Sequence, residues 1–236
     1  MVSLKNKILF VIAPHPDDEV LGCGGLIGKI KKENGKVYVL FMTNGTTLDF
    51  SSRGISTQSE REKEMKEVAN FLHYDDYKIA FPGSDYHLRL DRLPQKDIMF
   101  EIEQGKKISL QKIRPDIIAF PAQGDYNQDH VAISRAAFAA CRPTQRQNKF
   151  IPNIVLSYEE VTDFWAQHQK PNINFFVALS DREIINKVRA LNIYKSQMRG
   201  NGHPRNENAI NSLAILRGSA IGADFAEGFH CLKLIL

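Results

Sequence analysis

The chain has 236 residues, of which 43% are hydrophobic and 25% charged, and a formal net charge of +4. This composition suits one ordinary α/β domain and excludes a disordered tail or a fibrous protein. No apolar run approaches the roughly 20 residues that span a bilayer, and the mixed charges accompany no nucleic-acid-binding module, so neither a transmembrane segment nor nucleic-acid binding is expected.

The first apolar run, residues 8–13, follows two lysines and resembles the start of a signal peptide. It is too short for the apolar core of one, and acidic residues follow where a cleavage site needs small residues. We interpret this run as the first β-strand of a cytoplasmic protein. The three cysteines are far apart and form no CxxC pair, which predicts reduced thiols and makes Cys23 a weak candidate nucleophile.

The next 130 residues alternate apolar runs with segments of helical spacing. In chain order the expected elements are strand 7–13, helix 20–33, strand 37–43, helix 57–72, strand 77–81, helix 95–113, strand 116–122 and helix 129–141. Nearly uninterrupted apolar strands separated by helices predict a parallel sheet that is covered on both faces.

Beyond residue 150 the pattern is looser. Strands are expected at 153–158 and 174–179, and helices at 180–199 and 206–217. There is no internal repeat or clear linker, so residues 1–236 are predicted to form a single domain. The predicted fold is a Rossmann-like α/β/α sandwich of three layers with a mostly parallel sheet.

A histidine and three acidic residues follow the first strand directly, in Pro14-His15-Pro16-Asp17-Asp18-Glu19. Ligands of open parallel sheets bind beyond the carboxyl ends of the strands. Carboxylates this close raise one another's pKa unless a cation neutralises them, and a metal ion is the simplest neutraliser. His15 and Asp18 can converge on one ion, which leaves Asp17 free to act as a base.

A second polar cluster, Gly124-Asp125-Tyr126-Asn127-Gln128-Asp129-His130, follows the fourth strand. If the first and fourth strands are neighbours, His130 can supply a third ligand. Two histidines, one carboxylate and an open position make a catalytic zinc site. Such an ion polarises a carbonyl and lowers the pKa of a bound water molecule.

Two simpler interpretations stay open for these clusters. Asp17 or Asp18 could cap the first helix, and Asp129 could cap the helix after the fourth strand. Glycines at 22, 24 and 28 also raise dinucleotide binding, but eight residues, three of them acidic, separate them from the first strand. A phosphate-binding glycine loop begins immediately after its strand, so this alternative is weak.

At these residues the sequence resembles the PIG-L/LmbE family of metal-dependent deacetylases. Residues 13–25, APHPDDEVLGCGG, are similar to the family's AHPDDE motif, and residues 124–130, GDYNQDH, to its second histidine motif, with Gln128 in place of the usual proline. Weaker similarities cover most of the chain. They lie at 43–45, at Arg61 and Glu64, at 194–197, at 203–205 and at 226–229.

The resemblance implies a Rossmann-like fold and hydrolysis of an N-acetyl group from an amino sugar. By position it makes His15, Asp18 and His130 the metal ligands, and Asp17 the general base. The resemblance also implies that Arg61 contacts the substrate and that His203 stabilises the oxyanion or donates a proton to the amine. It implies further that Asp129 orients a ligand or the base. A surface salt bridge of Arg61 with Glu64, and an ordinary loop role for His203, are the alternatives.

The resulting hypothesis is a zinc-dependent N-deacetylase that acts on an N-acetylglucosamine-type sugar, free or conjugated, and binds one Zn²⁺ per chain. Iron, cobalt, nickel or manganese also suit such a ligand set. An amidohydrolase acting on a non-sugar N-acyl amine would use the same residues, and a non-catalytic binding protein could keep the fold. The sequence leaves open whether the protein forms a homo-oligomer and which aglycone the loops at 83–93 and 144–172 would accept.

Overall fold

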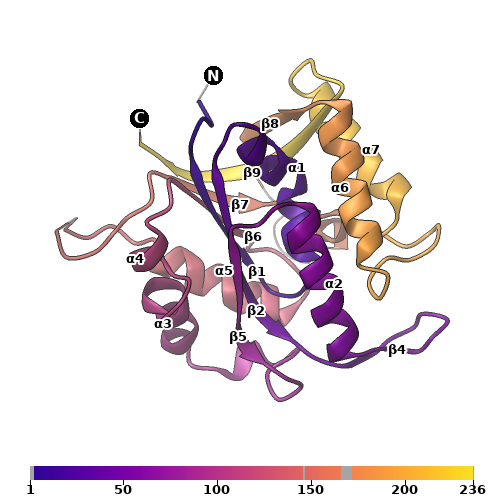
Figure 1. Cartoon of the computed structure of the whole chain (residues 1–236), viewed down its shortest axis with the longest axis horizontal. Helices are drawn as coiled ribbons and strands as arrows, with labels where there is room; N and C mark the ends of the chain where they lie inside the picture. Colours follow the sequence, from indigo (N-terminus) through magenta and orange to yellow (C-terminus); the bar gives the residue numbers. More distant parts are fainter. Residues whose placement is uncertain (1–2, 146, 166–171, 236) are drawn as a thin grey trace.

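The computed structural model describes residues 3–145, 147–165 and 172–235. At their centre lies a sheet of seven strands (Figure 1). The strand order is β5-β2-β1-β6-β7-β9-β8. These strands are β1 (Ile8–Ala13), β2 (Lys36–Asn44), β5 (Asp76–Pro82), β6 (Ile117–Pro121), β7 (Ile154–Tyr158), β8 (Phe175–Leu179) and β9 (Phe225–Leu234). Strand β9 pairs antiparallel with β7 and β8, whereas the other pairs of this sheet are parallel.

Strand β1 explains why the central strands are apolar on both faces. Its residues alternate between two core clusters: Leu9 and Val11 pack into one, and Phe10 and Ile12 into the other. Because side chains of a strand point to opposite faces in turn, a strand between two helical layers needs an apolar residue at every position. Residues Leu9–Ala13 are accordingly all fully buried.

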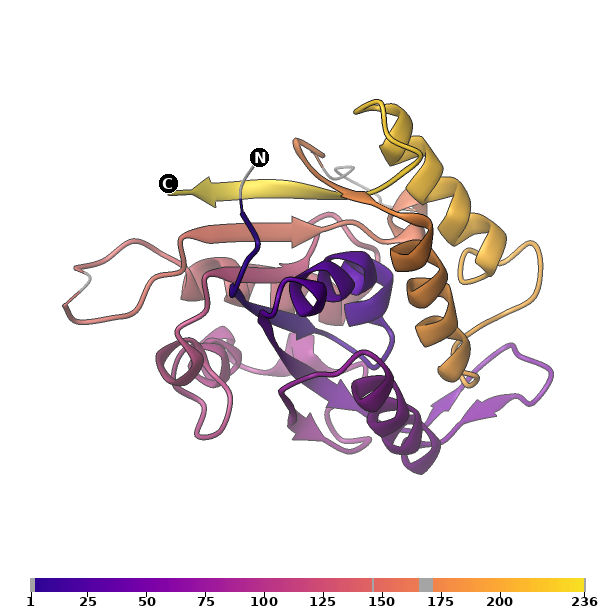
Figure 2. The same cartoon turned by 45° about the horizontal axis from the view of Figure 1, so that its top comes forward.

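Helices cover both faces of the sheet (Figures 1 and 2). One layer contains α1 (Asp18–Lys32), α2 (Gln58–Phe71), α6 (Asp181–Ile193) and α7 (Glu207–Ser219). The other contains α3 (Gln95–Gln104), α4 (Leu110–Ile113) and α5 (Gln128–Ala140). The expected Rossmann-like sandwich with a mostly parallel sheet is therefore confirmed. Two short 3₁₀ helices, η1 (Leu90–Arg92) and η2 (Val161–Trp165), lie in the connections.

Two predictions of secondary structure need correction. The single helix expected at 95–113 is two helices, because α3 ends at Gln104 and is followed by Gly105, where a Cβ would lie 2.5 Å from the carbonyl oxygen of Glu101. The helix expected at 180–199 ends at Ile193, and the following segment is held instead by hydrogen bonds between Ser196 and Glu64 of α2.

Strand β9 and a small hairpin were not expected at all. The hairpin pairs β3 (Thr47–Leu48) with β4 (Ile55–Ser56) and projects from the molecule beside α2 (Figure 2). Strand β9 is defined by pairing with strands from distant parts of the chain, and the two strands of the hairpin are too short to show an apolar period.

The sheet topology decides where the two polar clusters meet. Strands β1 and β6 are direct parallel neighbours, so the segments that follow Ala13 and Pro121 leave the sheet at the same edge. Among the described residues, no helix is long and apolar enough to cross a membrane.

Candidate metal centre and active site

A cavity of about 160 Å³ opens at this edge of the sheet. Its wall contains side chains from several separate parts of the chain, which gather at the carboxyl ends of β1 and β6. They include His15, Asp17, Asp18, Arg61, His87, Asp125, Tyr126, His130 and Arg205. A concave site rich in ionisable groups at this position is where an open α/β sheet binds its ligand.

Three side chains on the cavity wall point one atom each toward a common centre. The Nδ1 atom of His15 lies 3.4 Å from Oδ2 of Asp18, and Nε2 of His130 lies 3.2 Å from that oxygen. The two ring nitrogens are 3.3 Å apart. An ion with four ligands at about 2.0–2.1 Å separates neighbouring ligand atoms by about 3.3–3.4 Å. The three atoms therefore fit one face of a tetrahedral zinc-type site.

Each of these histidines has a carboxylate on the far side of its ring. Nε2 of His15 lies 3.0 Å from Oδ2 of Asp129. Nδ1 of His130 lies 2.7 Å from Oδ2 of Asp125, within ion-pair distance although outside hydrogen-bond geometry. Carboxylates at the outer nitrogens favour protons there and leave the lone pairs of the inner nitrogens for a metal. Asp129, which was predicted to orient a neighbouring group, thus contacts His15.

The charged groups around the two rings shift one another's pKa values. Burial alone would lower the pKa of His15, but Asp129 and Asp18 outweigh it and raise that pKa. Burial alone would raise the pKa of Asp18, but His130 and His15 outweigh it and hold that pKa well below the usual range. Three carboxylates, those of Asp18, Asp125 and Asp129, are buried against the two rings. A divalent ion can balance their charge, so the residues present fit a metal.

Asp17 lies beside this centre in a strained backbone conformation. Its φ is 117°, a region that non-glycine residues rarely adopt, and its side chain makes no helix-capping hydrogen bond. Its Oδ2 instead accepts a hydrogen bond from Nη1 of Arg205 at 3.1 Å. Burial and the charge of Asp18 raise the pKa of Asp17 to about 6, against the opposing effect of Arg205 and Arg61. Strain of this kind is concentrated at functional sites.

The capping interpretations do not describe the carboxylates of these clusters. Oδ2 of Asp18 accepts the backbone N–H of His15 at 2.7 Å, within the loop that precedes α1. At the start of α5 the capping side chain is Asn127, which accepts the N–H of Asp129. The carboxylate of Asp129 accepts the N–H groups of Leu88 and Leu90 as well as contacting His15.

Arg61 lines the cavity and is almost fully buried. Its guanidinium lies 3.2 Å from Nε2 of His87 and donates to Oγ1 of Thr47 at 3.1 Å. The alternative partner, Glu64, instead accepts two hydrogen bonds from Ser196. Arg61 is thus positioned to face a bound molecule, and its role as a substrate contact stays a prediction.

His203 lies elsewhere, against a second cavity of about 470 Å³ between the β3–β4 hairpin and residues 195–203. Its Nδ1 accepts the backbone N–H of Arg205 at 3.0 Å, and the side chain is not among those lining the first cavity. The arginine two residues further on reaches the site in its place. The role predicted for His203 stays a prediction that this arrangement of the loop does not favour.

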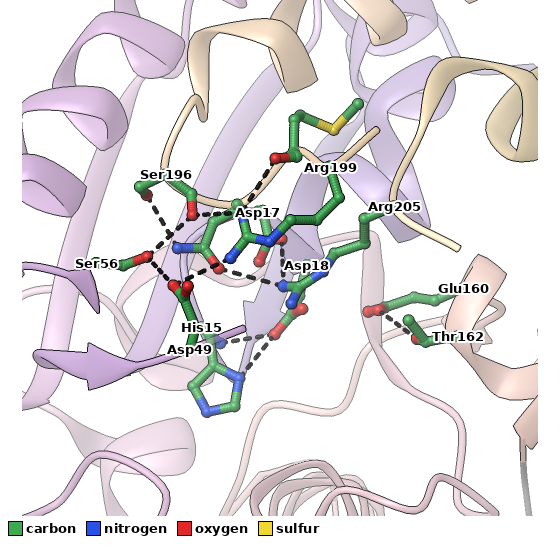
Figure 3. A network of polar contacts seen from close by, with 12 residues as sticks. His15, Asp17, Asp18, Asp49, Ser56, Glu160, Thr162, Ser196, Arg199 and Arg205 are labelled. Atoms are coloured by element: carbon green, nitrogen blue, oxygen red, sulfur yellow. Dashed lines mark hydrogen bonds and ion pairs between the residues drawn. The ribbon is translucent and has the colours of Figure 1, made fainter. Parts of the chain in front are cut away.

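A polar network connects Asp17 to the hairpin (Figure 3). Arg205 donates to Oε1 of Gln197, and the Gln197 amide donates to the Ser196 hydroxyl. The Ser56 hydroxyl in β4 contacts both the Ser196 carbonyl and the carboxylate of Asp49, and Asp49 also pairs with Arg199 at 3.1 Å. The C-terminal part of the chain thereby helps to fix the position of Asp17.

Sequence reasoning missed three residues of this site. Asp125 and Arg205 lie in the segments 124–130 and 203–205, but the sequence assigned them no role. Whether either side chain enters the site depends on the conformation of its loop. His87 lies in a segment with no motif, so no sequence signal marked it.

Comparisons with known proteins give consistent similarities. The family model described as GlcNAc-PI de-N-acetylase, PIG-L, matches residues 10–141. The chain is 28% identical to the diacetylchitobiose deacetylase of Thermococcus kodakarensis, over 95% of this chain and 82% of that protein. The structure of the conserved protein TT1542 from Thermus thermophilus matches with a TM-score of 0.71 at 27% identity, covering 97% of this chain and 95% of that one.

The same fold also occurs with a different chemistry. The 4-carboxy-2-hydroxymuconate hydratase GalB from Pseudomonas putida matches with a TM-score of 0.71 at 19% identity, over 98% of both chains. A similarity at this identity concerns the fold alone. The reaction must therefore be argued from the site residues.

Proposed function

The chain belongs to the PIG-L family of GlcNAc-PI de-N-acetylases, and we propose that it is a metal-dependent hydrolase that removes the N-acetyl group from an amino sugar. The substrate is of N-acetylglucosamine type, free or conjugated. Its relative from Thermococcus is named for deacetylation of diacetylchitobiose, a compound of this class.

One observation carries this proposal. Two histidines and a carboxylate converge within 3.2–3.4 Å, and an uncoordinated carboxylate, Asp17, stands beside them in the same cavity. Two histidines and one carboxylate leave a fourth position open on a tetrahedral ion. A site that binds metal only for stability is closed and has no need of an additional strained, buried base.

We assign the ligand positions to His15, Asp18 and His130, with zinc as the expected metal. When bound, such an ion polarises the amide carbonyl and makes a water molecule more acidic. Asp129 and Asp125 hold the two imidazoles in the orientation that binding requires.

Asp17 acts as the general base. Its carboxylate takes a proton from the attacking water as the water oxygen bonds to the acyl carbon. The C–N bond then breaks, and the protonated Asp17 returns the proton to the departing nitrogen. The products are acetate and a free amine. Arg205, which pairs with Asp17, fixes the direction of the carboxylate, and Arg61 contacts the sugar or its substituent.

Two other functions use the same framework. An amidohydrolase for a non-sugar N-acyl amine would keep every residue above and differ only in the substrate-facing loops. A non-catalytic binding protein would keep the fold, but it would have no need of Asp17 beside the ligand set.

The test combines metal content with product release. Protein purified without chelator or metal-binding tag is expected to contain close to one zinc or other transition metal per chain by elemental analysis. It should release acetate from N-acetylated sugars but not from N-acetylated alkylamines of similar size. His130→Ala should lose the metal, whereas His73→Ala, which changes an exposed histidine, should keep it.

Each outcome separates the alternatives. Metal without turnover on any N-acyl compound would favour the binding protein, and turnover restricted to alkylamines would favour the non-sugar amidohydrolase. No metal after reconstitution would overturn the proposed centre.

A further inference from the structure

His87 is a buried histidine in the cavity wall that the proposed reaction does not yet use. Only 6% of its surface is exposed, and it comes from the loop between β5 and η1. Its ring stands edge-on to that of His15, with centroids 5.1 Å apart. It packs against Gly45, where a Cβ would lie 2.5 Å from Cβ of His87. The glycine after β2 therefore lets this ring reach the ligand set.

The neighbours of His87 determine which ring nitrogen carries the proton. Nη1 of Arg61 lies 3.2 Å from Nε2, and an arginine can only donate. Oγ1 of Thr47 lies 2.7 Å from the same Nε2 and already accepts from Nη2 of Arg61, so its own hydrogen is available to the ring. Two donors thus point at Nε2, which must be the acceptor. The imidazole is neutral, with its proton on Nδ1.

That Nδ1–H has no protein partner among the described residues, although the atom is buried. A buried donor without an acceptor loses the hydration that it has in the unfolded chain, and no hydrogen bond replaces it. The surroundings nevertheless hold the ring firmly in this state through Arg61 and Thr47. An oriented, unpartnered donor beside a ligand cavity indicates an acceptor atom on the bound molecule.

We propose that His87 is a further catalytic residue, whose Nδ1–H donates a hydrogen bond to the acyl oxygen of the substrate as that oxygen gains negative charge. This inference rests on the proposed hydrolysis of an N-acyl group. His87 and the proposed ligand His15 line the same cavity with their rings in contact, so an acyl group bound at that ligand set would lie beside the ring of His87. Since Nε2 is occupied by two donors, His87 stabilises charge and does not shuttle a proton.

Two amide substitutions distinguish the role of Nδ1 from that of Nε2. In His87→Asn the amide nitrogen can take the place of Nδ1, whereas in His87→Gln the amide oxygen can take the place of Nε2. We expect His87→Gln and His87→Ala to lower kcat by about 10²- to 10³-fold, as for the loss of one oxyanion donor. His87→Asn should stay within about tenfold of the wild type, with KM nearly unchanged in all three.

The opposite order would overturn the proposal. If His87→Gln keeps its kcat and His87→Asn loses it, the ring serves to hold Arg61 through Nε2. An effect on KM alone would make His87 a contact to a sugar hydroxyl. Elemental analysis of each variant should find the wild-type metal content, because a loss of metal would place the effect at His15 instead.

A second measurement does not depend on turnover. Long-range ¹H–¹⁵N spectra of the imidazoles, assigned with the His87 variants, should show His87 as the neutral Nδ1–H form. An Nε2–H or doubly protonated ring would overturn the inference. If the wild type binds metal but hydrolyses no N-acyl compound, the proposed function fails, and these spectra still decide the tautomer.

Discussion

The proton positions around His15 and His130 follow from the carboxylates that flank them. Asp129 and Asp125 occupy the outer nitrogens, so the inner nitrogens and Asp18 present three electron pairs to one point. Such an arrangement is repulsive unless a proton or a metal lies between them. The three side chains can thus bind one cation, whereas Asp17, one residue away, is turned toward Arg205 and does not join them.

Asp17→Asn tests the division of roles between neighbouring carboxylates. The amide keeps the size of the side chain but cannot take a proton, so kcat should fall by about 10²- to 10⁴-fold, the usual contribution of a general base. Metal content should stay at the wild-type level, because His15, Asp18 and His130 are unchanged. Asp97→Asn, at an exposed position of α3, is the matched control. Turnover close to that of the control would remove Asp17 from the base role.

The pH dependence of kcat/KM follows from the same residue. A base works only when ionised, so the rate should fall tenfold per pH unit below the pKa of Asp17 in the free enzyme. Burial and Asp18 raise that pKa to about 6, and a bound cation would lower it. We therefore expect kcat/KM to rise with pH and to level off at or below pH 6. A rate that still climbs steeply above pH 7 would assign the base to another group.

The site shows which residues a sequence can and cannot identify. His15, Asp17 and Asp18 could be predicted because six consecutive residues following a strand place them together. His130 could be predicted only through the expected adjacency of the first and fourth strands, which β1 and β6 satisfy. Arg205 and His87 could not be predicted. Loop conformation alone decides that Arg205 rather than His203 faces Asp17, and His87 lies in a loop without a motif.

Helix α1 connects the site to the core through its glycines. Gly22 lies against the ring of Tyr158, where an added Cβ would come within 2.3 Å of the aromatic carbons. Tyr158 is fully buried and donates to the carbonyl oxygen of Ile12 at 3.0 Å. A methyl group at Gly22 must therefore displace either the helix that begins at Asp18 or the ring of Tyr158, which is hydrogen-bonded to β1 through Ile12.

Gly22→Ala and Gly28→Ala form a matched pair on this helix. At Gly28 an added Cβ would meet one atom, Cγ of Glu183, at an ordinary 3.8 Å. We expect Gly22→Ala to lower the free energy of unfolding by about 1–3 kcal/mol through overpacking. Gly28→Ala should raise it by about 0.5–1 kcal/mol, because alanine favours helix. Urea unfolding measures both, and changes of the same sign would contradict the packing described here.

The elements differ in how far local sequence determines them. Strands such as β1 and β2 are predictable because burial on both faces makes them continuously apolar. Strand β9 contains Glu227 and Lys233 and lacks that pattern. Its Glu227 accepts the N–H groups of Gly25 and Leu26 in α1 and pairs with the buried Lys187 of α6. Contacts across some 200 residues define this strand, and no local window contains them.

The candidate centre joins distant parts of the whole chain. His15 and Asp18 follow β1, His130 lies in α5, Arg61 in α2, and Arg205 precedes α7. Since these segments meet only in the folded sheet, the unfolded chain has no comparable site. Binding of an ion to the native state must then shift the folding equilibrium of the molecule.

Metal removal is therefore expected to destabilise the whole protein. An ion present at 100 times its dissociation constant adds about 2.7 kcal/mol to the stability of the native state. For a chain of this size that corresponds to a rise in Tm of roughly 5–10 °C. Thermal unfolding after chelation, and again after zinc is restored, measures the shift. Asp17→Asn should keep the full shift, because it retains all three ligands.

The ligand variant makes this measurement specific. His130→Ala removes a ligand from α5, so zinc should no longer raise its Tm, whereas His73→Ala should respond like the wild type. A nonspecific effect of zinc on the surface or on the three cysteines would instead raise or lower the Tm of every variant alike. An equal shift in His130→Ala and in the wild type would mean that the ion binds elsewhere. The loss of the shift in His130→Ala alone would establish that the ion binds through His130, whose Nε2 lies 3.3 Å from Nδ1 of His15.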